Sequence, residues 1–158
     1  MAFNKKVIID TPIMIDLLRG IEKSKNWLDG IETENILISV VTVAELIAGC
    51  RNKNEQKKVD RELKEYEVIY LSSKCCKLGL EWYKNFHLSY GVGFLDCLIA
   101  ATAYEKNVPI ATLNDKLFLS NTILYSAYIS FLTTIIKCLQ YKTFKSLSNP
   151  SVVHFSNV

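Results

Sequence analysis

The sequence predicts an α/β fold in which helices cover both faces of a mainly parallel sheet. Short runs of β-branched residues alternate along the chain with helical patterns, in the order β-α-β-α-β-α-β. The chain of 158 residues is long enough for one core, and its 49% hydrophobic and 22% charged residues are typical of a folded globular protein. We therefore expect one main domain that buries a substantial core.

The first half of the chain supplies two strands, each followed by a helix. A strand is predicted at residues 7–9, where three aliphatic residues end at Asp10. Thr11 and Pro12 are then typical of an N-cap followed by proline at the first helical position. A second buried strand is predicted at residues 36–40, and a helix over residues 42–50 should end near Gly49.

The second half continues the alternation and ends in a fourth strand. Its expected elements are an amphipathic helix at residues 53–66, a strand at 68–71, a helix at 74–88, an alanine-rich helix at 95–106 and a strand at 108–112. The alanine-rich helix has little polar surface, so we expect it to be buried. Two glycines, Gly91 and Gly93, should break the chain just before it.

Cysteine content and charge exclude several classes of protein. Five cysteines are an odd number without a C-x-x-C pair, which argues against both a disulfide framework and a zinc knuckle and favours a cytoplasmic location. The apolar run that directly precedes Asp10, at residues 7–9, has only three residues, too few for the core of a signal peptide. The net charge of +3 is too small to indicate a nucleic-acid partner by itself.

Acidic and amide side chains fall where a parallel sheet would place a site. Asp10 and Asn114 follow the first and fourth strands, whose carboxyl ends should share one edge of the sheet. Glu45 stands in an apolar stretch with no lysine or arginine within four residues, and Asp96 opens the alanine-rich helix. Clustered carboxylates attract hard, oxygen-seeking cations, so Mg²⁺ or Mn²⁺ is the expected cofactor.

Each acid also has a purely structural interpretation when it is taken alone. Asp10 could cap the following helix, and Asp96 could serve the dipole of its own helix. Glu45 could lie on an exposed helix edge, since glutamate is seldom fully buried. The residues by themselves leave both interpretations open.

Four sequence blocks, taken together, resemble a known family. They are Ile-Ile-Asp-Thr at residues 8–11, Ile-Ser-Val-Val-Thr-Val-Ala-Glu-Leu at 38–46, Gly-Val-Gly-Phe-Leu-Asp-Cys-Leu-Ile-Ala-Ala-Thr-Ala at 91–103, and Thr-Leu-Asn at 112–114. In this order they resemble the motifs of VapC-type PIN domains, the toxin halves of bacterial VapBC toxin–antitoxin pairs. The similarity covers roughly residues 5–118.

The resemblance implies a three-layer α/β/α domain that acts as a metal-dependent endoribonuclease on single-stranded or looped RNA. It also implies a VapB-type antitoxin as partner and a homodimer. By position, the residues that match the family are Asp10, Glu45, Asp96 and Asn114 as metal ligands, Asp115 beside the fourth position as a further catalytic candidate, and Thr11 and Thr112 as supporting hydroxyls. These roles follow from the resemblance and not from the spacing of the residues.

Three departures from the family pattern leave a second function open. Pro12 stands where the family often has Asn or Ser, and Asn114 offers a neutral oxygen where a carboxylate is expected. Residues 1–118 are predicted to form the nuclease core, whereas residues 119–158 form an atypical C-terminal extension that does not align. The alternative is a catalytically weak PIN-like module that binds RNA or antitoxin.

The extension also raises the question of a membrane segment. Residues 117–136 contain no charged side chain and have the length of a bilayer-spanning helix. Their many serine, threonine and asparagine residues make them more polar than a typical spanning helix. We therefore expect no membrane role.

Overall fold

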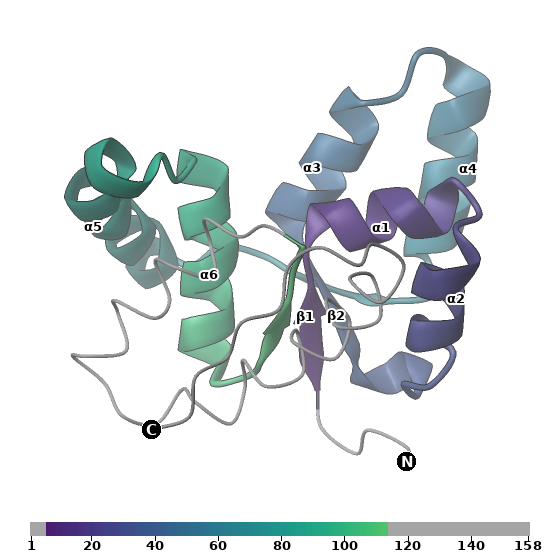
Figure 1. Ribbon diagram of the computed structural model, residues 1–158, viewed down its shortest axis with the longest axis horizontal. Coiled ribbons are helices and arrows are strands. Elements are labelled where there is room, and N and C mark those ends of the chain that lie inside the picture. The colour runs from purple at the N-terminus through teal and green to yellow at the C-terminus, as the bar shows by residue number, and fades with distance from the viewer. Residues whose placement is uncertain (1–5, 114–158) are drawn as a thin grey trace, which may run out of the picture.

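The chain folds as a parallel sheet between two groups of helices (Figure 1). A computed structural model describes residues 6–113, so the predictions for Asn114, Asp115 and the extension lie outside the described residues. Within that part the sheet has four strands in the order β3-β2-β1-β4, all paired in parallel. The strands are β1 (Val7–Ile9), β2 (Ile36–Ser39), β3 (Glu67–Ile69) and β4 (Ile110–Ala111). The predicted α/β class is confirmed.

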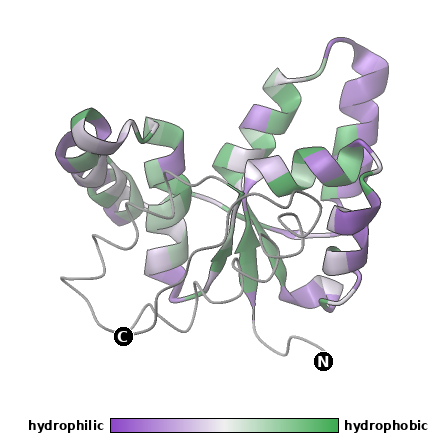
Figure 2. Ribbon diagram, in the orientation of Figure 1, coloured by the Kyte–Doolittle hydropathy of each residue, from purple (hydrophilic) through white to green (hydrophobic). Residues whose placement is uncertain are grey.

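The helices divide between the two faces of the sheet. One group contains α1 (Thr11–Leu18), α2 (Glu22–Leu28), α3 (Val40–Ala48) and α4 (Lys53–Leu63), and the other contains α5 (Ser73–Tyr90) and α6 (Phe94–Lys106). Because side chains alternate along a strand, Ile9 packs with the first group and Ile8 with α6. In Figure 2 the strands β1, β2 and β4 are mainly hydrophobic, whereas α4 is mostly hydrophilic.

The register places the end of β1 between two other strand ends. Ile9 lies opposite Ile38 of β2 and Ala111 of β4. The next residue, Asp10, therefore leaves the sheet at the edge where parallel strands place their ligands.

Several boundaries differ from the predictions for local reasons. The helix α3 begins at Val40, within the strand expected at residues 36–40, because the Ser39 hydroxyl accepts a hydrogen bond from the Val41 N–H at 3.2 Å and caps the helix. The helix α2 and a 3₁₀ turn, η1 (Thr33–Asn35), were not predicted. In α2 only Ser24 and Leu28 are buried, so its sequence shows no apolar stripe.

No helix among residues 6–113 combines the length and the apolar character that crossing a bilayer requires. The segment at 117–136, which raised the question, lies outside the described residues.

Candidate functional site

Asp10 ends β1 and is also the N-cap of α1. Its Oδ1 accepts a hydrogen bond from the Thr11 N–H at 2.8 Å, and the Thr112 hydroxyl donates to its Oδ2. The side chain is buried, with the residue only 1% exposed. The expected cap at Thr11 is therefore wrong by one residue: Thr11 is the first residue of α1, and Pro12 the second. Proline still fits there, because the first-turn N–H groups have no partner within a helix.

The surroundings of Asp10 disfavour the ionised form of its carboxyl group. The pKa of Asp10 is raised to about 6, mainly because the side chain is buried. The hydrogen bonds from Thr112 and Thr11 act in the opposite direction, and the negative charges of Asp96 and Glu45 add smaller upward contributions to the pKa. The three acids that the sequence places on different elements thus interact electrostatically in the fold, with Asp10 as the buried member.

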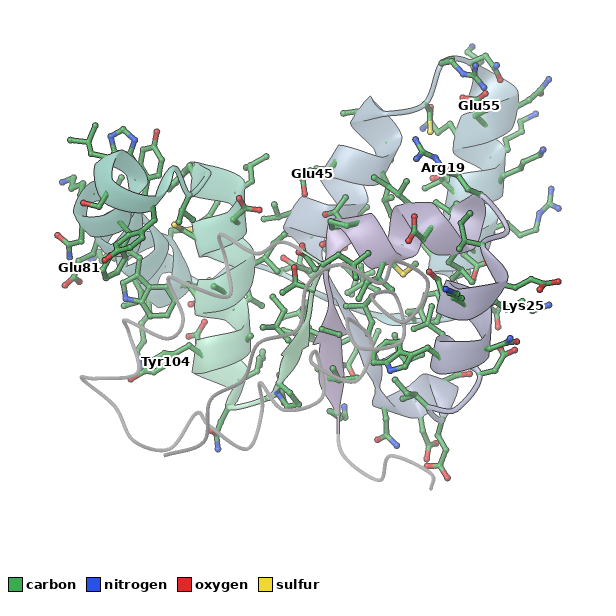
Figure 3. The ribbon with its side chains drawn as sticks, viewed as in Figure 1. Arg19, Lys25, Glu45, Glu55, Glu81 and Tyr104 are labelled. Carbon is green, nitrogen blue, oxygen red and sulfur yellow. The ribbon has the colours of Figure 1, made fainter. Side chains whose placement is uncertain are left out.

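Glu45 reaches this region from α3 and is held by α1. The Thr11 hydroxyl donates to Glu45 Oε2 at 2.5 Å, and the Thr42 hydroxyl lies 3.3 Å from the same Thr11 oxygen. A hydroxyl has a single proton, and the closer, charged acceptor is the carboxylate. In Figure 3 Glu45 extends from α3 on the side that faces α6. Glu45 is half-buried. The interpretation that it lies on an exposed helix edge, which the sequence left open, is therefore wrong.

Thr42 is a site neighbour that the sequence analysis did not single out. It is fully buried and lies three residues before Glu45, on the same face of α3. The available signal was this spacing, but a threonine within an apolar run is equally typical of ordinary helix packing.

Asp96 serves its helix and the site at once. It is the third residue of α6, and its Oδ2 accepts a hydrogen bond from the Gly93 N–H at 3.1 Å. A carboxylate here also compensates the positive end of the helix dipole. The helix-capping interpretation is thus correct, and it holds together with the electrostatic effect of Asp96 on Asp10.

The side chains around Asp10 offer carboxylate and hydroxyl oxygens, the donor type that hard divalent cations prefer. Among residues 6–113 no three acidic, histidine or cysteine side chains already stand in a metal-binding arrangement. Glu45 and Asp96 each turn one oxygen toward a protein donor, but a carboxylate has two oxygens with about four acceptor positions. The electrostatic strain on buried Asp10 is the kind that a cation relieves.

Comparison with known proteins agrees with this geometry. The family model described as PIN domain matches residues 7–121, most of the chain. The chain belongs to the PIN-domain family. Ribonuclease VapC10 of Mycobacterium tuberculosis is 33% identical over 110 residues, covering 68% of this chain and 82% of that protein. The likeness identifies the chain as a VapC-type PIN domain.

Solved structures share the fold of this PIN domain. A toxin–antitoxin complex from Klebsiella pneumoniae has a TM-score of 0.62 at 24% identity, covering 72% of this chain and 90% of that one. The structure of VapBC2 from Rickettsia felis, bound to a DNA fragment from its promoter, has a TM-score of 0.57 at 26% identity. That match covers 73% of this chain and 90% of the other.

Proposed function

We propose that this VapC-type PIN domain is a Mg²⁺- or Mn²⁺-dependent endoribonuclease and the toxin of a VapBC-type pair. The observation that carries the proposal is the buried Asp10 carboxylate at the carboxyl end of the sheet, within electrostatic reach of Glu45 and Asp96. The ribonuclease name of the Mycobacterium tuberculosis relative supports the activity.

In the proposed mechanism Asp10, Glu45 and Asp96 are the residues that would hold the divalent ion. When bound, the ion would lower the pKa of a coordinated water and offset charge on the scissile phosphate. The residues of this chain keep the ligands in place: Thr112 and the Thr11 N–H orient Asp10 and favour its ionised form, while the Thr11 hydroxyl orients Glu45. Asn114 or Asp115 would complete the fourth position of the pocket.

The partners follow from the same pocket. We expect a VapB-type antitoxin to inhibit the nuclease by bringing an arginine or lysine to the three carboxylates, because no basic side chain of residues 6–113 contributes to the pKa shift of Asp10. The VapBC2 complex from Rickettsia felis supports a partner of this type. A homodimer is expected on the same family grounds.

The decisive experiment is cleavage of structured RNA by the purified full-length protein in Mg²⁺, Mn²⁺ or EDTA. Activity should require the metal and should fall by at least about a hundredfold in Glu45→Gln, since a metal ligand is lost. Glu55→Gln is the matched control, because Glu55 is paired with Arg51 at the outer end of α4 (Figure 3). It should cleave like the wild type.

The alternative of a catalytically weak binding module has its own outcome in this assay. Glu45 and Asp96 already hydrogen-bond to protein donors, as they would in such a module. Cleavage that is absent in all three conditions, or equal in EDTA and Mg²⁺, would contradict the metal-dependent nuclease.

A further inference from the structure

The helix α4 carries a row of basic side chains on its outer face. These side chains follow one another at intervals of four, four and three residues, which places them on one side of the helix: Lys53, Lys57, Arg61 and Lys64. All four residues are exposed, whereas the apolar side of the same helix is buried in the core. In Figure 3 side chains with nitrogen at their ends extend from α4 on the side away from α3. We call these four residues the basic stripe.

The positive charges of the basic stripe are mostly left without compensation. None of the four residues takes part in an ion pair among residues 6–113. Two of the three acids of α4 are held elsewhere: Glu55 pairs with Arg51, and Glu62 accepts a hydrogen bond from the Tyr66 hydroxyl at 2.7 Å. The third acid, Asp60, can offset only one of the four charges. The stripe therefore keeps an excess of positive charge.

The pattern of the basic stripe disfavours the helix that carries it. Lys57 lies four residues from both Lys53 and Arg61, and like charges at this spacing destabilise a helix where opposite charges would stabilise it. Lys53 is also the first residue of α4, at the positive end of the helix dipole, where an acid would be favourable. Helix stability therefore does not explain the stripe, whereas a negatively charged partner does.

The proposed RNA substrate needs basic side chains outside the catalytic pocket. The pocket combines three carboxylates, and no basic side chain of residues 6–113 contributes to the pKa shift of Asp10. These carboxylates repel the phosphates of an approaching RNA. Attraction to the RNA backbone must therefore come from another part of the surface.

The basic stripe begins at the end of the molecule that holds the pocket. The helix α3, which carries Glu45, leads through residues 49–52 into α4, and this turn stands beyond the carboxyl ends of the strands (Figure 1). From Lys53 to Lys64 the stripe is about 16 Å long, at 1.5 Å per residue of helix. That length matches roughly five phosphates of a stacked strand, at about 3.4 Å for each.

We propose that the basic stripe of α4 binds the sugar–phosphate backbone of the RNA substrate, independently of its sequence, while the three acids act on one phosphate in the pocket. The inference rests on the proposed ribonuclease function. Phosphate contacts position a nucleic acid without reading its bases. Each such contact releases counterions, so the affinity that the stripe provides falls as the salt concentration rises.

The test measures how a fluorescently labelled RNA hairpin binds to the full-length protein in EDTA, by anisotropy, at KCl concentrations up to about 1 M. The stripe variant carries Lys53→Gln, Lys57→Gln and Arg61→Gln. Because three phosphate contacts are lost, the slope of log K against log [KCl] should become shallower by about two. The Kd at about 0.1 M KCl should then rise about a hundredfold, whereas the two proteins should agree near 1 M. Glutamine favours helices about as well as lysine, so Tm should be unchanged or higher.

A control variant removes the same charge from α5, on the other face of the sheet. It carries Lys74→Gln, Lys77→Gln and Lys84→Gln, and these three residues are also exposed. The net charge is the same in both variants, so the control should bind RNA with nearly the wild-type slope. An unchanged slope in the stripe variant, or an equal change in the control, would overturn the binding role of the stripe. A wild type that binds RNA through the stripe but does not cleave it in Mg²⁺ would instead contradict the proposed nuclease function.

Discussion

At the scale of single residues, Asp10 is both the N-cap of α1 and a buried carboxylate that interacts with two other acids. It caps α1 with one oxygen and receives the Thr112 hydroxyl with the other, yet burial and two nearby carboxylates disfavour its charge. An ordinary N-cap is solvated and keeps a low pKa. The buried charge of Asp10 therefore lowers the stability of the metal-free protein above its pKa, and in the proposed function this is the charge that a cation would neutralise.

Stability of the metal-free protein should depend on pH through Asp10. Its pKa of about 6 in the folded chain, against about 3.9 unfolded, means that the folded state binds this proton more tightly. The stabilising contribution is therefore complete below pH 4 and is lost as the pH rises through 6. In EDTA, Asp10→Asn should be more stable than the wild type by about 3 kcal/mol at pH 8 and nearly equal at pH 4. Urea unfolding at both pH values would contradict this if the difference were constant.

Thr112 should affect how the rate of RNA cleavage depends on pH in the acidic range. Its hydrogen bond favours the ionised form of Asp10, so Thr112→Val should raise the pKa of Asp10 further. At subsaturating Mg²⁺ the rate should then fall off at a higher pH than in the wild type. Thr112→Ser keeps the hydroxyl and should retain the wild-type profile. Identical profiles for the valine and serine variants would exclude this role.

At the scale of elements, the sequence predicts what depends on local pattern. The four strands and the longer helices follow from aliphatic runs and from the amphipathic pattern of residues 53–66. Helix α2 was missed because it is held by its packing beside α1 and buries only Ser24 and Leu28. The start of α3 was placed late because its first four residues, three valines and a threonine, favour a strand until the Ser39 cap is seen.

In the candidate site, too, some features could be predicted from the sequence and others could not. Family motifs place Asp10 directly after β1, Glu45 within α3 and Asp96 in the first turn of α6, and the structure has them there. Side-chain directions could not be predicted, because the hydrogen bond between Thr11 and Glu45 joins residues 34 positions apart.

The turn between α5 and α6 should depend on a single glycine. Gly91 ends α5 in the left-handed region, with φ of 62° and its N–H bonded to the His87 carbonyl at 2.8 Å. Gly91→Ala should lower the free energy of unfolding by about 1 kcal/mol, and Gly91→Asn by less, since asparagine tolerates this conformation. Asn107 ends α6 in the same way. Chemical denaturation is the measurement.

Gly49 provides the matched control for that prediction. It follows α3 with φ of −77°, and an added Cβ would meet only ordinary contacts of 3.5 Å and more. Gly49→Ala should therefore leave stability unchanged or slightly higher. A loss equal to that of Gly91→Ala would show that backbone conformation is not the cause.

At the scale of the whole molecule, the site and the core share one framework. Asp10 follows the central strand β1 directly, and Glu45 and Asp96 come from helices that pack on the sheet. Binding in the pocket therefore acts on the folded domain as a unit. A ligand bound only by the native state stabilises that state by mass action.

Magnesium should accordingly raise the melting temperature of the full-length protein. At a hundred times its Kd the gain is about 2.7 kcal/mol, roughly 10 °C for a domain of this size. Asp10→Asn should show little or no shift, because the buried ligand charge is gone. Equal shifts in both proteins, measured by thermal unfolding at matched ionic strength, would place the bound Mg²⁺ elsewhere.

The hydrogen bond between Thr112 and Asp10 joins residues that are 102 positions apart. The two residues directly follow β4 and β1, which pair in the sheet although they are the last and the first of the described strands. A growing polypeptide emerges from the ribosome amino terminus first, so Asp10 appears early and waits for almost the whole domain before its partner follows. Contacts this distant in sequence also form late in folding, because closing a long loop costs entropy. A nascent chain therefore cannot complete the pocket until residue 112 has been released from the ribosome.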